Sequence, residues 1–140
     1  MGYIFLALLF YTVAILTGAA ASRHANTSFI SLIANLFSVF APLAVIVPTF
    51  SKRLITGHRF GISMAVVDGI AAGLFVLAIN KSFSVNKVGI VVPIVFGGAI
   101  LLSTIASYFL FKEKISWIEG LGLALMLVGI AVVTYARAIA

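Results

Sequence analysis

The chain has 140 residues, of which 64% are hydrophobic and 9% charged, and it contains no cysteine. A soluble domain carries about a quarter charged residues on its surface, so this composition excludes a water-soluble globular protein and indicates one membrane domain. The net charge of +6 does not indicate nucleic-acid binding. The basic residues stand singly or in pairs between apolar runs, which is where the loops of membrane proteins keep them.

Five apolar runs follow one another, each near the ~20 residues that a helix needs to cross a bilayer. Short polar breaks separate the runs, so consecutive helices run antiparallel and the termini lie on opposite sides of the membrane. Strands are excluded because lipid offers no partner for an open sheet edge. The predicted fold is all-α, with one domain over residues 1–140 and transmembrane helices at 3–21, 29–50, 60–80, 88–111 and 117–136.

A polar stripe follows one side of the second run. Its members recur at helical spacing, and lipid-facing positions have little use for hydroxyls or an amide. We therefore expect this side to face the protein interior, where it either lines a solute pathway or bonds to neighbouring helices. The stripe consists of Ser31, Asn35, Ser38, Pro42 and Thr49.

Three prolines interrupt the apolar runs, and a smaller polar pair follows on the fourth run. Pro42, Pro48 and Pro93 are expected to kink their helices and to free carbonyls that a cavity can hydrate. Thr104 and Tyr108 lie four residues apart and so share a helix face. We expect Pro93, Thr104 and Tyr108 to belong to the same pathway as the stripe.

The third run contains Asp68, an acid within the membrane, which costs about 2.5 to 3.5 kcal/mol on insertion scales. A helix that keeps such a group shows it to other helices or to a water-filled cavity. Small residues at every fourth position form a bare ridge on this run, and the fourth run repeats the spacing, so we expect close helix packing at both. The packing residues are Gly61, Ala65, Gly69, Gly73, Gly89 and Gly97.

Local motifs mark several helix ends. Ser116 and Glu119 have the spacing of a capping box at the start of the fifth run, which assigns Glu119 a structural role. Asn26 and Asn80 each begin an Asn-x-Ser triplet, the pattern of a glycosylation acceptor. Because both lie where predicted helices begin or end, we interpret these triplets as chance matches or helix caps.

Enzymatic classes are disfavoured. Catalysis by proton transfer, a nucleophile or a metal needs converging ionisable groups, and Asp68 is the only ionisable residue within the apolar runs' central part. His24 and His58 fall on opposite sides of the predicted membrane. We expect no catalysis, no metal and no organic cofactor.

Four segments between Gly61 and Val133 share a family pattern: Ala-Ile-Asn-Lys after the third run, Val-Val-Pro-Ile in the fourth, Phe-Leu-Phe-Lys-Glu-Lys-Ile-Ser before the fifth, and the stretch from Gly120 to Val133. On these segments the chain resembles an EamA-type domain of the drug/metabolite transporter superfamily. Such domains usually carry a proline in the fourth helix, matched by Pro93, and a loop glutamate, matched by Glu113. The resemblance implies half of a ten-helix inverted-repeat transporter fold.

A lone repeat lacks half of such a site, because transporters of this type place the substrate between two repeats near the middle of the membrane. The short-loop basic residues number five on the amino-terminal side, namely Lys52, Arg53, Arg59, Lys112 and Lys114, and four on the other, namely Arg23, Lys81, Lys87 and Arg137. This balance predicts insertion in both orientations and an antiparallel homodimer.

The functional hypothesis is alternating-access transport of small metabolites or drug-like solutes across the cell membrane. Two alternatives stay open: a membrane scaffold or accessory subunit that does not transport, and a half-transporter that pairs with a different chain. Asp68 is the candidate for proton coupling, because two antiparallel copies would place their carboxyls at nearly the same depth, where burial and repulsion favour a proton. A structural role, bonded to a neighbouring carbonyl or hydroxyl, is the other reading of this residue.

Overall fold

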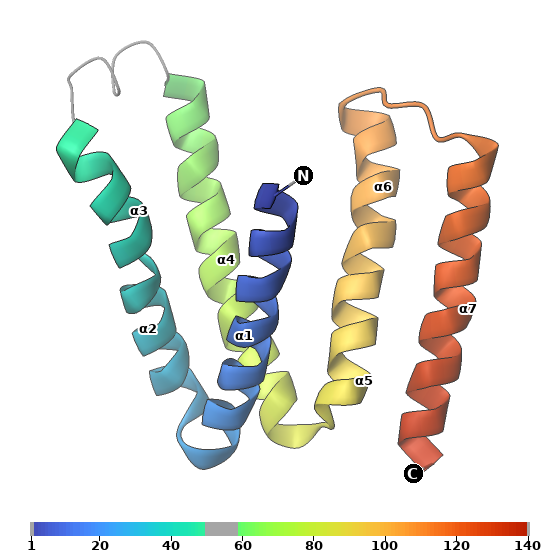
Figure 1. The fold of residues 1–140 in the computed structure, drawn as a ribbon, viewed down its shortest axis with the longest axis horizontal. Coiled ribbons are helices and arrows are strands. Elements are labelled where there is room, and N and C mark those ends of the chain that lie inside the picture. Colours follow the sequence, from blue (N-terminus) through green and yellow to red (C-terminus); the bar gives the residue numbers. More distant parts are fainter. Residues whose placement is uncertain (1, 50–58, 140) are drawn as a thin grey trace. The chain divides into compact units, whose positions relative to one another are not determined.

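The structure, a computed structural model, describes residues 2–49 and 59–139, and every regular element in these ranges is helical (Figure 1). This confirms the predicted all-α class. Lys52, Arg53 and His58, which we placed in a loop, lie outside the described residues. The elements are α1 (Gly2–His24), α2 (Thr27–Ser38), α3 (Phe40–Ile46), η1 (Val47–Thr49), α4 (Arg59–Val85), α5 (Val88–Val92), η3 (Pro93–Gly97), α6 (Gly98–Leu110) and α7 (Trp117–Ile139).

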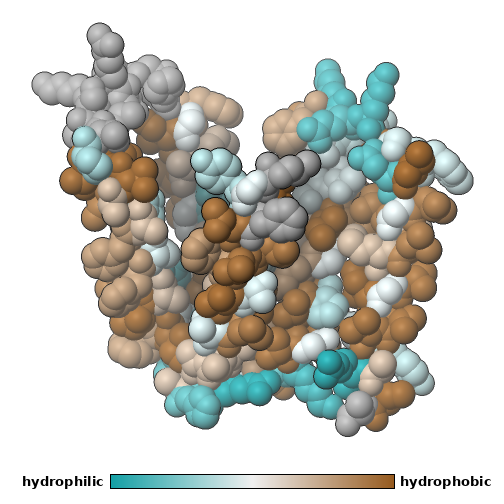
Figure 2. All heavy atoms as spheres, viewed as in Figure 1, coloured by the Kyte–Doolittle hydropathy of each residue, from teal (hydrophilic) through white to brown (hydrophobic). Residues whose placement is uncertain are grey.

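Five helical spans within the described residues are long and apolar enough to cross a membrane, as the sequence predicts. Most large apolar side chains on them are exposed, for example Phe109 at 72% and Leu125 at 65%. Figure 2 shows hydrophilic residues at the helix ends and mainly hydrophobic residues between them. Such a surface is unfavourable in water and favourable in lipid, so it fits a multi-pass membrane protein. The spans are Gly2–His24, Thr27–Ile46, Phe60–Val85, Val88–Leu110 and Trp117–Ile139.

Each proline coincides with a departure from α-helical geometry, which confirms the expected irregularities. The second span is interrupted at Val39, between α2 and α3, three residues before Pro42. A proline has no N–H and its ring crowds the carbonyl four residues earlier, so the backbone near residue 38 leaves the regular pattern. Pro48 lies in the 3₁₀ turn η1, and Pro93 begins the π-helical turn η3.

The chain divides into two compact units, Met1–Ser84 and Val85–Ala140. In the first unit, α1, α2 and α4 meet at a small buried core that includes Ala19, Ile79 and Phe83. Three buried polar side chains, Ser22, Ser31 and Asn80, belong to the same core. The first unit is therefore held by polar contacts as well as by apolar packing.

In the second unit, α7 runs antiparallel to the continuous span formed by α5, η3 and α6. Two contacts align these helices: the Ile130 side chain lies against Gly97, and the Arg137 side chain lies against Gly89. A Cβ atom at either glycine would crowd that neighbour. The close packing predicted for Gly89 and Gly97 is therefore present.

The ridge of small residues on α4 behaves differently. A Cβ added to Gly61, Gly69 or Gly73 would meet no atom within 4 Å, and Ala65 is exposed. Among the described residues, no helix packs closely against these positions. The ridge instead leaves open space along α4, and part of that space forms the groove described below.

Both predicted caps at helix starts are present. The Asn26 side chain accepts hydrogen bonds from the backbone N–H groups of Ser28 and Phe29 at the start of α2. At the start of α7, the Ser116 N–H donates to Glu119 Oε2 at 2.8 Å and the Glu119 N–H donates to Ser116 Oγ at 3.2 Å. These reciprocal bonds are those of a capping box, which confirms the structural role predicted for Glu119.

Of the two interpretations of the Asn80 triplet, the cap at a helix end is wrong, whereas a chance match to the glycosylation pattern is consistent with the buried side chain. The third span does not end at residue 80, because α4 continues to Val85. Asn80 lies inside the helix, with only 4% of its surface exposed. Hydropathy marks Asn-Lys-Ser as a polar break, but the asparagine has a buried partner on α2 and so does not end the helix.

Candidate functional site

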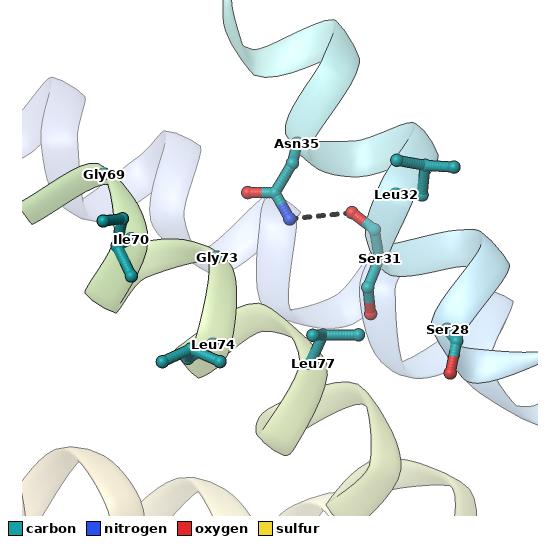
Figure 3. A pocket seen from close by; sticks show the side chains of 9 residues that line it. All are labelled: Ser28, Ser31, Leu32, Asn35, Gly69, Ile70, Gly73, Leu74 and Leu77. Atoms are coloured by element: carbon teal, nitrogen blue, oxygen red, sulfur yellow. Dashed lines mark hydrogen bonds between the residues drawn. The ribbon is translucent and has the colours of Figure 1, made fainter. Parts of the chain in front are cut away.

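A groove between α2 and α4 is the candidate site in the first unit. Its volume is about 550 Å³, which is in the range of pockets for small ligands. Most of its surface is apolar, and the two glycines on α4 widen it because they carry no side chain. Figure 3 shows the residues that line it, namely Ser28, Ser31, Leu32 and Asn35 from α2 and Gly69, Ile70, Gly73, Leu74 and Leu77 from α4.

Asn35 places an amide in this groove. Its Nδ2 donates to the Ser31 carbonyl oxygen at 2.8 Å, which fixes the orientation of the side chain. In Figure 3 the amide oxygen of Asn35 points toward the Gly69 to Gly73 stretch of α4. An exposed carbonyl oxygen in an otherwise apolar groove can accept a hydrogen bond from a solute, which orients that solute.

Ser31 and Asn80 join the two sides of the groove. The Ser31 hydroxyl donates to the Thr27 carbonyl at 2.7 Å and lies 3.3 Å from the Val76 carbonyl on α4. Asn80 Nδ2 donates to Ser31 Oγ at 2.9 Å, and both side chains are buried. A buried polar group in a membrane protein needs such partners, since lipid supplies none.

Gly18 allows α1 to approach the Ser31 and Asn80 pair. A Cβ at Gly18 would lie 3.3 Å from Asn80 Oδ1, which is tighter than most contacts of real Cβ atoms. The absence of a side chain at Gly18 therefore allows α1 to lie close against the Asn80 amide. Asn80 of α4 thus lies in contact with both α1 and α2.

The groove lies near the middle of the third span. The helix Phe60–Val85 has its centre between Ala72 and Gly73, and Gly73 lines the groove. On the second span, Thr27–Ile46, the lining residues Ser28 to Asn35 lie in the first half, so the groove is central along α4 only. The end of α4 lies five residues beyond the end that we predicted.

The longer helix also changes the expectation for Asp68. This residue lies four to five positions from the centre of its span, which is about 7 Å at 1.5 Å per residue. In an antiparallel pair with that centre at the midplane, the two carboxyls lie on opposite sides of it. The expectation of two carboxyls at nearly the same depth rested on a helix that ended at Asn80; with the longer helix it requires the midplane to lie nearer Asp68 than the helix centre does, and it stays a prediction.

Asp68 is exposed on α4, directly before the groove residue Gly69. Among the residues that the structure describes, its carboxylate makes no hydrogen bond or ion pair. The alternative of an acid bonded to a neighbouring carbonyl or hydroxyl therefore has no partner in this part of the chain. An exposed acid within a membrane span requires a protein or water neighbour to satisfy it.

The structure brings together only part of the predicted pathway. Asn35 lines the groove, whereas Ser38 at the end of α2 and Pro42 on α3 are exposed and do not line it. Three further pathway residues, Pro93, Thr104 and Tyr108, belong to the second unit. Thr104 donates its hydroxyl to the Ile100 carbonyl, and Tyr108 packs edge-on against Phe109.

Several groove residues escaped the sequence reasoning. Ile70, Leu74 and Leu77 read as ordinary lipid-facing residues, because nothing in a hydropathy pattern distinguishes a groove wall from a lipid contact. A usable signal existed in Gly69 and Gly73, whose missing side chains open the space between the helices. Comparison with models of known families, with curated proteins and with solved structures finds no match to this chain.

Proposed function

We propose that this chain is a small-solute transporter of the drug/metabolite transporter type, which works by alternating access as an antiparallel homodimer in the cell membrane. The observation that carries the proposal is the groove at the centre of the third span, with an apolar lining and one orienting amide oxygen from Asn35. A solute that fits it is small, largely apolar and carries a hydrogen-bond donor.

The exposed ridge of α4 supports the dimer. Gly61, Ala65 and Gly69 leave this helix open to close approach, and Asp68 needs a neighbour that the described part of the chain does not supply. A second copy covering this ridge would shield Asp68 from lipid. It would also close the groove from the side and complete the cavity that a single repeat leaves open.

Filling the groove tests the proposal. Gly73→Leu adds a side chain in open space, so the fold should persist while the groove is blocked. We expect Gly73→Leu to lower solute uptake about tenfold or more in liposomes that contain this chain alone, assayed with sets of radiolabelled amino acids, sugars and lipophilic amines. Gly122→Leu is the control, because Gly122 on α7 is equally open but lies neither in the groove nor on the α4 ridge that the second copy would cover. Equal uptake by the two variants, or no uptake by wild type, contradicts the proposal.

The coupling role proposed for Asp68 has its own test. Asp68→Asn keeps the size of the side chain and can still form hydrogen bonds, but it cannot ionise. We expect proton-gradient-driven accumulation to be lost, while exchange of labelled for unlabelled solute without a gradient continues. Accumulation at the wild-type level would show that Asp68 does not carry the coupling proton.

A further inference from the structure

Two basic side chains converge where α5 begins and α7 ends. Lys87 directly precedes α5, and its Nζ donates to the backbone carbonyl oxygen of Arg137 at 3.2 Å. The Arg137 side chain lies across Gly89, where an added Cβ would be 3.2 Å from Nε and 3.4 Å from Cδ. Both basic residues are exposed. Because Gly89 has no side chain, the Arg137 guanidinium can lie against the start of α5, close to Lys87.

Among the described residues of the second unit, no acidic side chain lies near this pair of charges. The chain has three acidic residues: Asp68 is in the first unit, and Glu113 and Glu119 lie before and at the start of α7, the opposite end of that helix from Arg137. Within the described residues the Arg137 guanidinium makes no hydrogen bond or ion pair, so its five N–H donors are available. Two like charges held together in this way attract an anion from outside the chain.

The position along the helices sets the surroundings of this pair. Lys87 comes one residue before the span Val88–Leu110, and Arg137 lies two residues before the end of Trp117–Ile139. Tyr135, 67% exposed, is on the same last turns of α7. Tyrosine is enriched at the headgroup level of membranes, and basic residues at this depth meet lipid phosphates.

We propose that Lys87 and Arg137 form a phosphate-binding site at the membrane surface, seated on Gly89 and suited to the headgroup of an anionic phospholipid. The planar guanidinium supplies two parallel N–H groups to two phosphate oxygens. The Lys87 ammonium is positioned by its hydrogen bond to the Arg137 carbonyl oxygen, and it adds a second positive charge beside the phosphate. This inference does not rest on the proposed transport.

The site is tested by lipid titration of the whole, detergent-solubilised chain, with bound lipid counted by native mass spectrometry. Phosphatidylglycerol is the anionic lipid and phosphatidylcholine the zwitterionic comparison. We expect Arg137→Gln to weaken phosphatidylglycerol binding about fivefold to tenfold, and Gly89→Ala, which shifts the guanidinium only slightly, to weaken it about twofold. Gly89→Ala is the sharper variant, because it keeps every charge, favours the helix, and only displaces the guanidinium.

The control for charge alone is Lys112→Gln with Lys114→Gln, which removes the same two charges as Lys87→Gln with Arg137→Gln but in the loop before α7. Retained binding in the loop variant, with loss in the other, supports the site. Displacement of the lipid by inorganic phosphate, beyond that by chloride at equal ionic strength, means that the site also takes phosphate from water, and no displacement restricts it to lipid. Equal loss in both double variants, or full binding by Gly89→Ala, overturns the proposal.

Discussion

Asn80 donates a hydrogen bond to Ser31, and removing either side chain has a different effect on the partner that remains. Without Asn80, the Ser31 hydroxyl keeps its bond to the Thr27 carbonyl. Without the Ser31 hydroxyl, the buried Asn80 Nδ2 loses the acceptor at 2.9 Å. A buried donor left without a partner costs about 1 to 3 kcal/mol, whereas a helix-to-helix bond within a membrane contributes on average about 0.6 kcal/mol.

We therefore expect Ser31→Ala to lower the free energy of unfolding more than Asn80→Leu does, although the serine is the smaller group. The measurement is unfolding by SDS in mixed micelles. Combining the two substitutions should cost less than their sum, since the leucine removes the orphaned donor. Ser63→Ala is the control, because that exposed hydroxyl bonds only to the Phe60 carbonyl of its own helix. An additive double variant would contradict the coupling.

Lys112 adopts a conformation that suits glycine. It follows α6, after the C-cap Phe111, and has a φ of 56°, in the left-handed region that closes many helices. A side chain in this region costs about 1 kcal/mol. We expect Lys112→Gly to raise the free energy of unfolding by about that amount. Lys114→Gly, which loses the same charge at a residue with ordinary φ, should not stabilise, and equal effects of the two would refute the conformational explanation.

At the scale of elements, the contact between η3 and α7 depends on Gly97. A Cβ there would overlap Ile130 Cδ1 and lie 2.9 Å from Cγ1. Isoleucine has one strongly preferred χ1 rotamer in a helix, so this side chain cannot easily move aside. Overpacking of this kind costs about 1 to 3 kcal/mol.

We expect Gly97→Ala to lower the free energy of unfolding, and Ile130→Ala to cost less in the Gly97→Ala background than alone. Gly98→Ala, one residue further along, meets no atom within 4 Å and should be neutral or slightly stabilising. All four variants are compared by the same SDS titration. Equal effects at positions 97 and 98 would show that α7 does not pack here as described.

The presence of the helices could be predicted from the sequence, because a run of ~20 apolar residues in lipid can satisfy its backbone hydrogen bonds only as a helix. Caps such as Ser116 with Glu119 could be predicted because they depend on neighbours along the chain. The end of α4 could not, since Asn80 tolerates the helix interior only through Ser31, on a different element. The predicted polar stripe included only Ser31 and Asn35 of the groove's lining, because the rest of its walls depends on which faces of α2 and α4 meet.

The small-residue ridge on α4 also shows that a local sequence pattern does not identify the partner of a residue. Spacing predicted close contacts equally at Gly69 and at Gly97, yet only Gly97 has a neighbour within the chain. A glycine pattern indicates that another group can approach the backbone closely, but it does not indicate which group does so. For α4 the occupant is a second copy in our proposal and lies outside a single chain.

For the whole molecule, orientation in the membrane follows from the basic residues at the two sets of helix ends. In the predicted topology, one side of the membrane carries Arg23, in the last turn of α1, and Arg137, in the last turn of α7, together with Lys81 and Lys87. Five basic residues oppose these four, as counted from the sequence. A difference of one gives no strong preference for either orientation.

Reporters fused after Ala140 should therefore give signal from both sides of the membrane. Phe111→Lys with Ile115→Lys, both exposed, raises the count to seven against four and should fix one orientation, because short-loop basic residues set topology. The mirror variant, Ala25→Lys with Val85→Lys, gives five against six and should shift the population the other way. If the dimer is antiparallel, the first variant alone should lose solute uptake, and coexpression of the two should restore it. A wild-type chain found wholly in one orientation would contradict the antiparallel homodimer, and the groove would then need a different chain to close it.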